Sequence, residues 1–539
     1  MWATARSVSL IGAVGHLIEV QVDVTNGVVG TSLVGRPDAA ISDARDRCRS
    51  AVHNSGFSWP SSRRITISLS PADIPKRGPH FDLAIATGVL VASDKKFPPG
   101  ALDDAVFVGE LGLDGRIRCV PGVLPMTMAA AARGIRRLYV PDPQVDEAAL
   151  VPGVEVVGLR SLRQLVAVLK GTEVPDDPPV VPLSGQPLLS WRGDDALDEV
   201  DMADIKGVAE ARYALEVAAA GGHSLLLTGP KGSGKTSLAE RLPTLLPDLG
   251  PDEALEVTAI QSLAGTLPRD GLLASRPPFR APHHSASRTA VLGGGTGQVR
   301  PGEVSKAHLG VLFLDEFPHF GSDIIEALRQ PLESGQVSVA RGEEQAIYPA
   351  RAIVVFACNL CKCGEFSANV PGNECTCDPP ALRHYRNRVS GPVADRVDIT
   401  RHVDRPSEWE LKDRLQVPEA SATIRARVTA ARSRQAARLD GTPWRLNAHV
   451  PGPVLSRSWP LTGPAAEQLT DEVASGRLTH RGATRVHRLA WTVADLRAVE
   501  CPSVDELVVA LALRTDGALP LDALPLPRLS GLPATGTGR

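Results

Sequence analysis

The stretch SLLLTGPKGSGKTSLAERL, residues 224–242, decides the fold of the part of the chain around it. It reads as an apolar strand, a glycine-rich loop and an amphipathic helix, which is the order that a phosphate-binding P-loop requires. A chance match to the short pattern is the alternative, and the order of strand, loop and helix argues against it. The stretch therefore predicts an α/β unit that binds a nucleotide.

The loop supplies the groups that would hold a triphosphate. Its members are Gly229, Pro230, Lys231, Gly232, Ser233, Gly234, Lys235 and Thr236. Backbone N–H groups and the amino terminus of the following helix bind phosphate oxygens. Lys235 is expected to reach the β- and γ-phosphates, and Thr236 is expected to ligate Mg²⁺. ATP and Mg²⁺ are the cofactors that this pattern predicts.

Two further apolar strands end in polar residues. GVLFLDEF ends with Asp315 and Glu316 before its last residue, and AIVVFACN ends with Asn359. Asp315 is expected to hold the Mg²⁺ shell, and Glu316 is expected to polarise the attacking water. Asn359 is expected to orient that water against the γ-phosphate. A surface acidic pair and an ordinary turn residue are the alternatives, which the upstream P-loop makes the weaker interpretation.

Arginines are the remaining catalytic candidates. Phosphoryl transfer needs positive charge near the transition state, often from an arginine finger, and Arg396 in RNRVSGPVADRVD is the candidate. In a ring, the neighbouring subunit would supply it; an ion pair with Asp398 is the alternative. Arg481 is the candidate second sensor on the helical pattern THRGATRVHRLAWTVADLRA, and Arg485 is its nearest rival.

Composition bounds the remaining functions. The 539 residues are 43% hydrophobic and 22% charged, which is ordinary for a globular chain. A net charge of −3 provides no global attraction to nucleic acid, so such binding needs a local basic surface. Apolar runs stay below the ~18 residues of a membrane span, so no membrane segment and a cytoplasmic location are expected.

Pattern and composition divide this α/β multidomain chain into five segments. The first alternates strand-like and helical runs, the second is a proline-rich linker, and the third carries the P-loop. An arginine-rich helical lid and a flexible tail follow. The expected segments are 1–172, 173–200, 201–404, 405–515 and 516–539. Five arginines on the first helical pattern of the lid, between Arg425 and Arg438, are expected to form a solvated or inter-subunit face, with nucleic acid the less favoured interpretation.

Five cysteines lie between residues 358 and 377. Four of them form two C-x-C pairs, namely Cys361, Cys363, Cys375 and Cys377. Four thiolates on two short loops can close a tetrahedral zinc site, and free thiols are the alternative. Because the insert lies between Asn359 and Arg396, a bound metal could set the position of Arg396.

Four stretches together resemble the magnesium-chelatase-like AAA+ proteins, and within them the ComM/YifB subfamily. These are DMADIKGVAEARYALEVAAAGGHSLLLTGPKGSGKT, PFRAPHHSASRTAVLGGGTGQVRPGEVSKAHLGVLFLDE, LRQPLESGQVSV and RNRVSGPVADRVD. The resemblance covers residues from about 4 to about 515. One departure from the family is Lys231, where relatives usually carry proline. The adjacent residues His283 and His284 are interpreted as loop packing or pore residues.

The resemblance implies an AAA+ core with a parallel sheet, a helical lid and a homohexameric ring. It also implies two insertions, Gly293–Glu303 and a hairpin within 336–355, whose Arg300 and Arg341 are the candidates for contact with DNA. The implied activity is ATP-driven DNA branch migration or unwinding in recombination or natural transformation. Solvated hairpin charges offset by Glu343 and Glu344 are the alternative for the arginines. A motor subunit of a metal chelatase and a chaperone-like assembly switch are the alternatives for the whole protein.

Residues 65–143 resemble the proteolytic domain of Lon protease, an α+β fold of the S5-like type. That family uses a Ser–Lys dyad. His80 and Leu124 stand at the two positions in this sequence, so peptidase activity is not expected. A dyad rebuilt from Ser68 or Ser70 with Lys76 is conceivable, although nothing in the sequence favours it.

Overall fold

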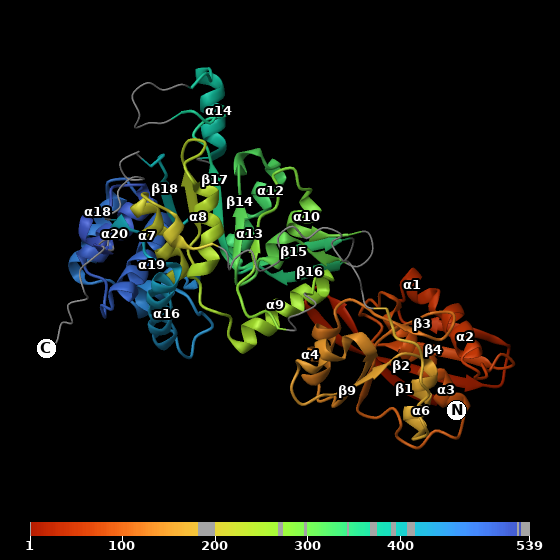
Figure 1. The fold of residues 1–539 in the computed structure, drawn as a ribbon. Helices are drawn as coiled ribbons and strands as arrows, with labels where there is room; N and C mark the ends of the chain where they lie inside the picture. Colours follow the sequence, from red (N-terminus) through yellow and green to blue (C-terminus); the bar gives the residue numbers. More distant parts are fainter. Residues whose placement is uncertain are drawn as a thin grey trace.

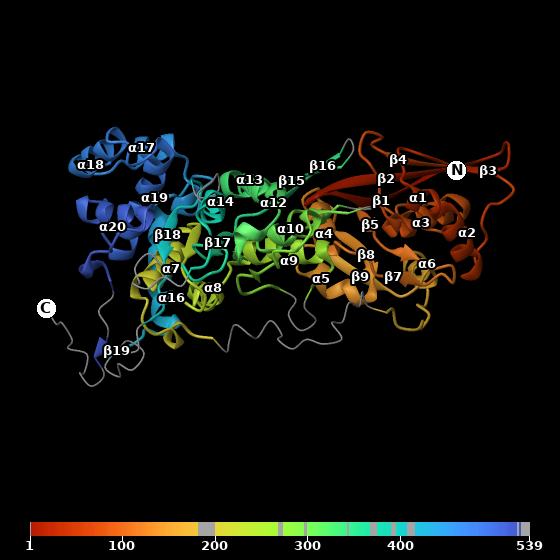
Figure 2. The same cartoon turned by 90° about the horizontal axis from the view of Figure 1, so that it is seen from above.

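The computed structural model describes residues 2–181, 200–267, 273–295, 299–341, 344–366, 375–389, 395–406, 416–524 and 528–529. They form an amino-terminal domain, a central core and a carboxyl-terminal group of helices (Figure 1). Seen from above, the core lies between the other two parts (Figure 2). Most of the predicted linker and the end of the predicted tail lie outside the described residues.

The amino-terminal domain contains two main sheets. The first has the order β1-β2-β4-β3 and is built from β1 (Trp2–Ile11), β2 (Val14–Thr25), β3 (Gly30–Val34) and β4 (Arg64–Ser70). The second is parallel and is built from β5 (Ala105–Phe107), β8 (Arg137–Pro141) and β9 (Glu155–Leu159). Alternate residues in the second half of β2 are buried because one face of the first sheet packs against helix α3 (Asp82–Ser93).

The first residues of the predicted linker pack on this domain. Asp177 is buried and accepts a hydrogen bond from the Ser161 hydroxyl. The carbonyl of Pro175 accepts a hydrogen bond from Gln164 Nε2 at 2.9 Å. The ordered domain therefore extends beyond the end of helix α6 (Leu162–Lys170).

The core is built on a five-stranded parallel sheet with the order β11-β14-β17-β10-β18. Its strands are β10 (Leu225–Thr228), β11 (Phe279–Arg280), β14 (Val311–Leu314), β17 (Ile353–Cys358) and β18 (Ile399–His402). Successive residues of the three central strands belong to two different apolar clusters, one on each face. Burial on both faces explains why these strands read as continuous apolar runs. The expected parallel-sheet core is confirmed.

Helices surround the sheet and form the carboxyl-terminal region. Those of the core include α7 (Ala209–Gly221), α8 (Lys235–Arg241), α9 (Pro251–Ala264) and the projecting α14 (Pro379–Val389) (Figure 1). Those of the lid are α16 (Ser421–Arg438), α17 (Gly452–Ser458), α18 (Gly463–Ala474), α19 (His480–Arg497) and α20 (Val504–Thr515). Among the described residues, no helix combines the length and apolar character needed to cross a bilayer.

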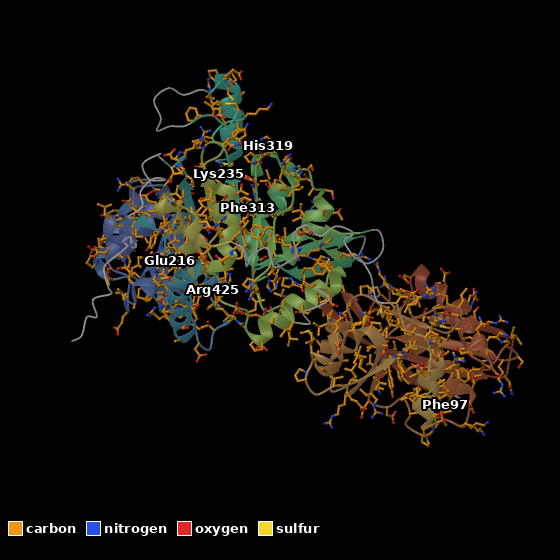
Figure 3. All side chains as sticks on the ribbon, viewed as in Figure 1. Phe97, Glu216, Lys235, Phe313, His319 and Arg425 are labelled. Carbon is orange, nitrogen blue, oxygen red and sulfur yellow. The ribbon has the colours of Figure 1, made fainter. Side chains whose placement is uncertain are left out.

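The arginines of α16 are partly or fully exposed but also bond within the molecule, which the expectation of a solvated or inter-subunit face did not include. Arg427 Nε lies 2.6 Å from Glu216 Oε1, and Arg427 Nη2 lies 2.7 Å from Glu419 Oε2. Arg432 donates to the carbonyl of Ala219 at 2.7 Å. Figure 3 labels Glu216 and Arg425 in the region where α16 packs against α7. Glu419 lies just before α16, but Glu216 and Ala219 belong to α7, about 200 residues earlier in the sequence, which spacing within α16 does not reveal.

Residues 516–524 also differ from the expected flexible tail. Arg401 of β18 is 3% exposed and donates to the carbonyl of Gly517 at 2.7 Å. Leu519 and Ala523 are buried in the apolar cluster shared by the core and the lid. This segment therefore belongs to the folded body.

Two hairpins of the core lie beside each other, and the second of them lies next to the amino-terminal domain (Figure 2). They pair β12 (Gly293–Gly294) with β13 (Arg300–Pro301), and β15 (Gln336–Arg341) with β16 (Glu344–Pro349). Tyr348 is fully buried, and its hydroxyl donates to the carbonyl of Val299 at 2.6 Å, which joins the two hairpins. Ala13, in the turn between β1 and β2, donates to the carbonyl of Ile347 at 3.4 Å. The amino-terminal domain thus contacts the second hairpin directly.

Replacing Arg427 with alanine should destabilise the packing of the lid on the core. The Glu216 side chain is 4% exposed and would keep its charge without the guanidinium that neutralises it. We expect the free energy of unfolding to fall by about 2–4 kcal/mol, measured by urea unfolding followed by circular dichroism.

Arg445→Ala is the matched control. It removes the partner of Glu253 from a pair in which the arginine is 63% exposed. Its effect should stay below about 1 kcal/mol, since exposed ion pairs contribute little. Equal effects of the two substitutions would contradict a structural role for the Arg427 pair.

Candidate nucleotide and metal sites

The P-loop runs from the carboxyl end of β10 to the start of α8. Gly229 has φ +151°, and a Cβ there would lie 2.2 Å from the carbonyl oxygen of Val403, so only glycine fits. Gly232 and Gly234 have φ of +74° and +88°, in the left-handed region. These conformations turn the backbone around a concave loop whose N–H groups can converge on phosphate oxygens.

Lys235 lies inside this loop. Its Nζ donates to the carbonyls of Gly229 at 2.9 Å and Pro230 at 2.7 Å. It also lies 3.3 Å from Oδ1 of Asn359, at the end of β17. Burial lowers the pKa of Lys235, and the charge of Asp315 opposes this. The ammonium is therefore positioned between the P-loop and the end of the neighbouring strand.

Thr236 and Asp315 meet at the same edge of the sheet. The Thr236 hydroxyl donates to Asp315 Oδ2 at 3.1 Å, and the N–H of Glu316 donates to Asp315 Oδ1 at 2.8 Å. A hydroxyl beside a carboxylate offers the hard oxygen ligands that Mg²⁺ prefers, so the residues fit this ion. The predicted residues of this site thus follow three neighbouring strands, of which β17 pairs with both β10 and β14. They are Lys235, Thr236, Asp315, Glu316 and Asn359.

A histidine that was interpreted as loop packing also reaches this site. His284 Nδ1 lies 3.4 Å from Glu316 Oε2. Its ring lies 4.1 Å from that of His283 and 5.7 Å from that of His319. Figure 3 shows His319 and Lys235 towards the end of the core from which α14 projects. Both adjacent histidines follow β11, whose carboxyl end lies at the nucleotide edge because β11 pairs in parallel with β14.

The predicted arginines lie at the opposite edge of the sheet. Arg396 Nε pairs with Glu333 Oε1 at 2.7 Å, and Arg485 Nη1 pairs with Asp398 Oδ1 at 2.7 Å. Together with Arg481, both arginines line a cavity of about 540 Å³ that includes Ser224, the residue before β10. The structure therefore separates these arginines from the P-loop of their own chain by the length of the strands.

Asp398 holds this edge together. It accepts hydrogen bonds from the N–H and hydroxyl of Ser224 at 3.2 and 3.3 Å. Burial acts to raise the pKa of Asp398, but the His223 ring, whose Nδ1 lies 3.4 Å from Asp398 Oδ2, and the charge of Arg485 outweigh it, and the pKa falls well below its usual range. Asp398 is thus a charged anchor between β10 and α19.

The four predicted cysteines converge. Cys361 Sγ lies 3.2 Å from Cys363 Sγ, which lies 3.6 Å from Cys375 Sγ, and the sulfurs of all four residues, with Cys377, lie within 4.8 Å of one another. Four sulfurs around a tetrahedral zinc are about 3.8 Å apart, so the group fits such an ion. Cys358 stays outside the group, and burial raises its pKa to about 12.

The insert lies beside the P-loop. The N–H of Lys231 donates to the carbonyl of Gly364 at 3.1 Å. Arg396 lies at the other edge of the sheet, so this contact does not support the hypothesis that the metal positions Arg396. The sequence order of Asn359, the cysteines and Arg396 suggested that hypothesis, but the chain returns to the amino edge of the sheet between the cysteines and the start of β18.

The two candidates for DNA contact lie away from the nucleotide edge. Arg300 is exposed on β13. Arg341 ends β15 and pairs in register with Glu344 near the turn of the hairpin. Glu343, one of the two expected offsetting charges, lies outside the described residues, and the other is Glu344.

Buried packing occupies the Lon-like positions. His80 is buried, its Nε2 lies 2.9 Å from the carbonyl oxygen of Val8, and burial lowers its pKa to about 4. Leu124 is fully buried in α4 (Val123–Ala131). Lys76 is buried and donates to the carbonyl of Pro71.

Comparisons with known proteins agree with this architecture. Residues 201–411 match the family described as magnesium chelatase, subunit ChlI, residues 20–144 match the family described as subunit ChlI of Mg-chelatase, and residues 418–514 match the ChlI C-terminal family. An uncharacterized protein of Mycobacterium tuberculosis is 44% identical over 516 residues, 95% of this chain and 99% of its own.

Two further relatives carry subfamily names. YifB of Escherichia coli is 38% identical over 497 residues, covering 92% of this chain and 94% of its own. Competence protein ComM of Haemophilus influenzae is 36% identical over 512 residues, covering 95% and 97%. The parallel core, the P-loop and these full-length similarities together mean that the chain belongs to the ComM/YifB subfamily of the magnesium-chelatase-like AAA+ proteins.

Proposed function

We propose that the protein is an ATP-hydrolysing ring motor that acts on DNA. The observation that carries the ATPase part is the meeting of Lys235, Thr236, Asp315 and Asn359 at one edge of the sheet, with Glu316 beside them. Family membership supports the same reaction.

Each residue of this edge has a defined task. ATP supplies the phosphoanhydride bond, and Mg²⁺ supplies the charge that neutralises its phosphates. The P-loop N–H groups and Lys235 would bind the phosphates, and the Thr236 hydroxyl and Asp315 carboxylate would hold the ion. Glu316 accepts a hydrogen bond from the attacking water, whose second contact is the Asn359 amide.

The opposite edge supports assembly into a ring. Arg396, Arg481 and Arg485 lie at the amino ends of the strands, away from the P-loop of their chain. In a homohexamer, the nucleotide edge of one subunit would face the arginine edge of the next. Arg396 would then stabilise the transition-state charge on the neighbour's phosphate. Arg485 is paired with Asp398, so Arg481 is the better second sensor.

Two observations support DNA as the proposed partner: the names of related proteins and the arginines on the two hairpins. The relative from Haemophilus influenzae is named a competence protein, and a short stretch, 16% of this chain, is 35% identical to a DNA repair protein RadA of Streptococcus pyogenes. Arg300 and Arg341 lie on two hairpins that contact each other through Tyr348 and Val299. Phosphate tracking needs such charges.

A chelatase motor is the second candidate, because the matching family models are named for a magnesium chelatase subunit. An assembly switch that moves no nucleic acid is the third. The four cysteines are proposed to hold Zn²⁺, which a reducing cytoplasm, the location expected from the sequence, would allow by keeping the thiols reduced.

DNA structure should control the ATPase rate. We expect forked or branched DNA to stimulate turnover more than linear duplex, single strands or a porphyrin, and Arg300→Ala with Arg341→Ala to reduce the stimulation. The stimulation should fall with rising salt, since phosphate contacts release counterions. Indifference to every nucleic acid would contradict the DNA part, and stimulation by porphyrin would favour the chelatase.

Glu316→Gln should bind ATP with Mg²⁺, but its rate of hydrolysis should fall by a factor of about 100 or more. The reason is that the amide cannot accept the proton of the water. Nucleotide binding and phosphate release measure the two steps separately. Glu326→Gln changes an exposed acid of the next helix and should leave both steps unchanged. Normal hydrolysis by Glu316→Gln would remove this residue from the site.

Arg396→Ala should inhibit wild-type subunits when the two are mixed, because one defective subunit leaves its neighbour without a finger. Activity should therefore fall more steeply than the wild-type fraction. Arg477→Ala, which breaks an exposed pair with Glu472, is the control and should have no effect. A strictly proportional loss with Arg396→Ala would contradict action between subunits.

A further inference from the structure

The cysteine insert is connected to the tip of the P-loop through one glycine. The carbonyl of Gly364 accepts the hydrogen bond from the N–H of Lys231 at 3.1 Å, and the N–H of Gly364 donates to the carbonyl of Cys361 at 3.2 Å. Two backbone bonds therefore link the P-loop to the first cysteine of the cluster.

Gly364 allows a closeness that another residue would oppose. Its φ is +85°, a conformation that strains any residue with a side chain. A Cβ would also lie 2.6 to 2.8 Å from three side-chain carbons of Lys231 and would force that side chain aside. The contact between insert and P-loop thus depends on glycine at this position.

Arg405 binds the carbonyl of the same residue, Lys231. Its Nε donates to the carbonyl of Lys231 at 2.9 Å, and its Nη2 lies 3.3 Å from Glu365 Oε2. The residue after Gly364 is therefore also connected to the P-loop. Both the N–H and the carbonyl of Lys231 are bonded, directly or through Arg405, to neighbouring residues of the insert.

The cysteines supply the feature that can fix the shape of the insert. Cys361 is fully buried, and its Sγ accepts a hydrogen bond from the N–H of Phe366 at 3.3 Å. Cys363, Cys375 and Cys377 are only partly buried, so apolar packing holds them weakly. Coordination of all four thiolates to one ion would join the two halves of the insert and hold Gly364 in place.

We propose that a soft divalent ion on the four cysteines, best matched by Zn²⁺, sets the affinity of the P-loop for ATP through Gly364. This inference rests on the proposed nucleotide binding. Loop N–H groups bind phosphate tightly only when they are already oriented, because ordering them on binding costs free energy. Loss of the ion releases the carbonyl of Gly364 and gives Lys231 conformational freedom, so ATP binds more weakly.

The test uses the full-length protein, elemental analysis for zinc, and titration with a fluorescent ATP analogue in magnesium buffer. Gly364→Ala keeps all four cysteines, so its zinc content should equal that of the wild type. Its Kd for the analogue should rise about five- to tenfold, as expected for losing one backbone hydrogen bond and the order it provides.

Gly153→Ala is the matched control. Gly153 has φ +80°, but nothing lies within 4 Å of its added Cβ, and it lies in the amino-terminal domain. It should bind the analogue as the wild type does. Removing zinc from the wild type with a chelator should raise Kd to the same extent as Gly364→Ala, and adding Zn²⁺ should restore it; Cys377→Ser should bind like the metal-free protein.

Three results would overturn the inference: wild-type affinity in Gly364→Ala, unchanged affinity in metal-free wild type, or a wild type that contains and takes up no zinc. If Cys377→Ser fails to fold, the Kd values of Gly364→Ala and of the chelated wild type still test whether the metal sets the affinity for ATP. A folded, zinc-containing wild type that binds no ATP would instead contradict the proposed function itself.

Discussion

The parallel pairing of β17 with β10 on one side and β14 on the other is the constraint on which the nucleotide edge depends. It brings the ends of segments far apart in the sequence together, so that Thr236 contacts Asp315 and Lys235 contacts Asn359. The alternation of side chains between two apolar clusters stabilises this order, because a one-residue slip would exchange the two faces. The site is therefore a product of sheet register, with the loop supplying the phosphate ligands.

Local features were predictable from the sequence, and features set by long-range packing were not. The P-loop and the polar ends of β14 and β17 follow from short patterns with a known chemical requirement. Arg485 lies at the amino ends of the strands because of the way α19 packs against the sheet. A local sequence pattern does not predict that packing. His284 reaches Glu316 because β11 lies beside β14, a neighbour relation that the sequence order does not give. The contact of Arg427 on α16 with Glu216 on α7 was missed for the same reason.

The two edges of the sheet have different electrostatic characters. The carboxyl edge has glycine loops, acids and one buried lysine, whereas the amino edge has several arginines around a cavity, with Asp398 as their anchor. A phosphate group is suited to lie between such surfaces, since each offers donors that the other lacks. This asymmetry is what a head-to-tail arrangement of identical subunits requires, because such an interface joins two different faces of the same chain.

The contact between Ala13 and Ile347 has a mechanical consequence. The turn between β1 and β2 is bonded to β16, and β16 is bonded through Tyr348 to the segment before β13. A displacement of either hairpin during a catalytic cycle must therefore carry the amino-terminal domain with it or break that bond. In the proposed motor, the domain would restrain the hairpins through this tether and through viscous drag, even though it contributes no group to the nucleotide edge.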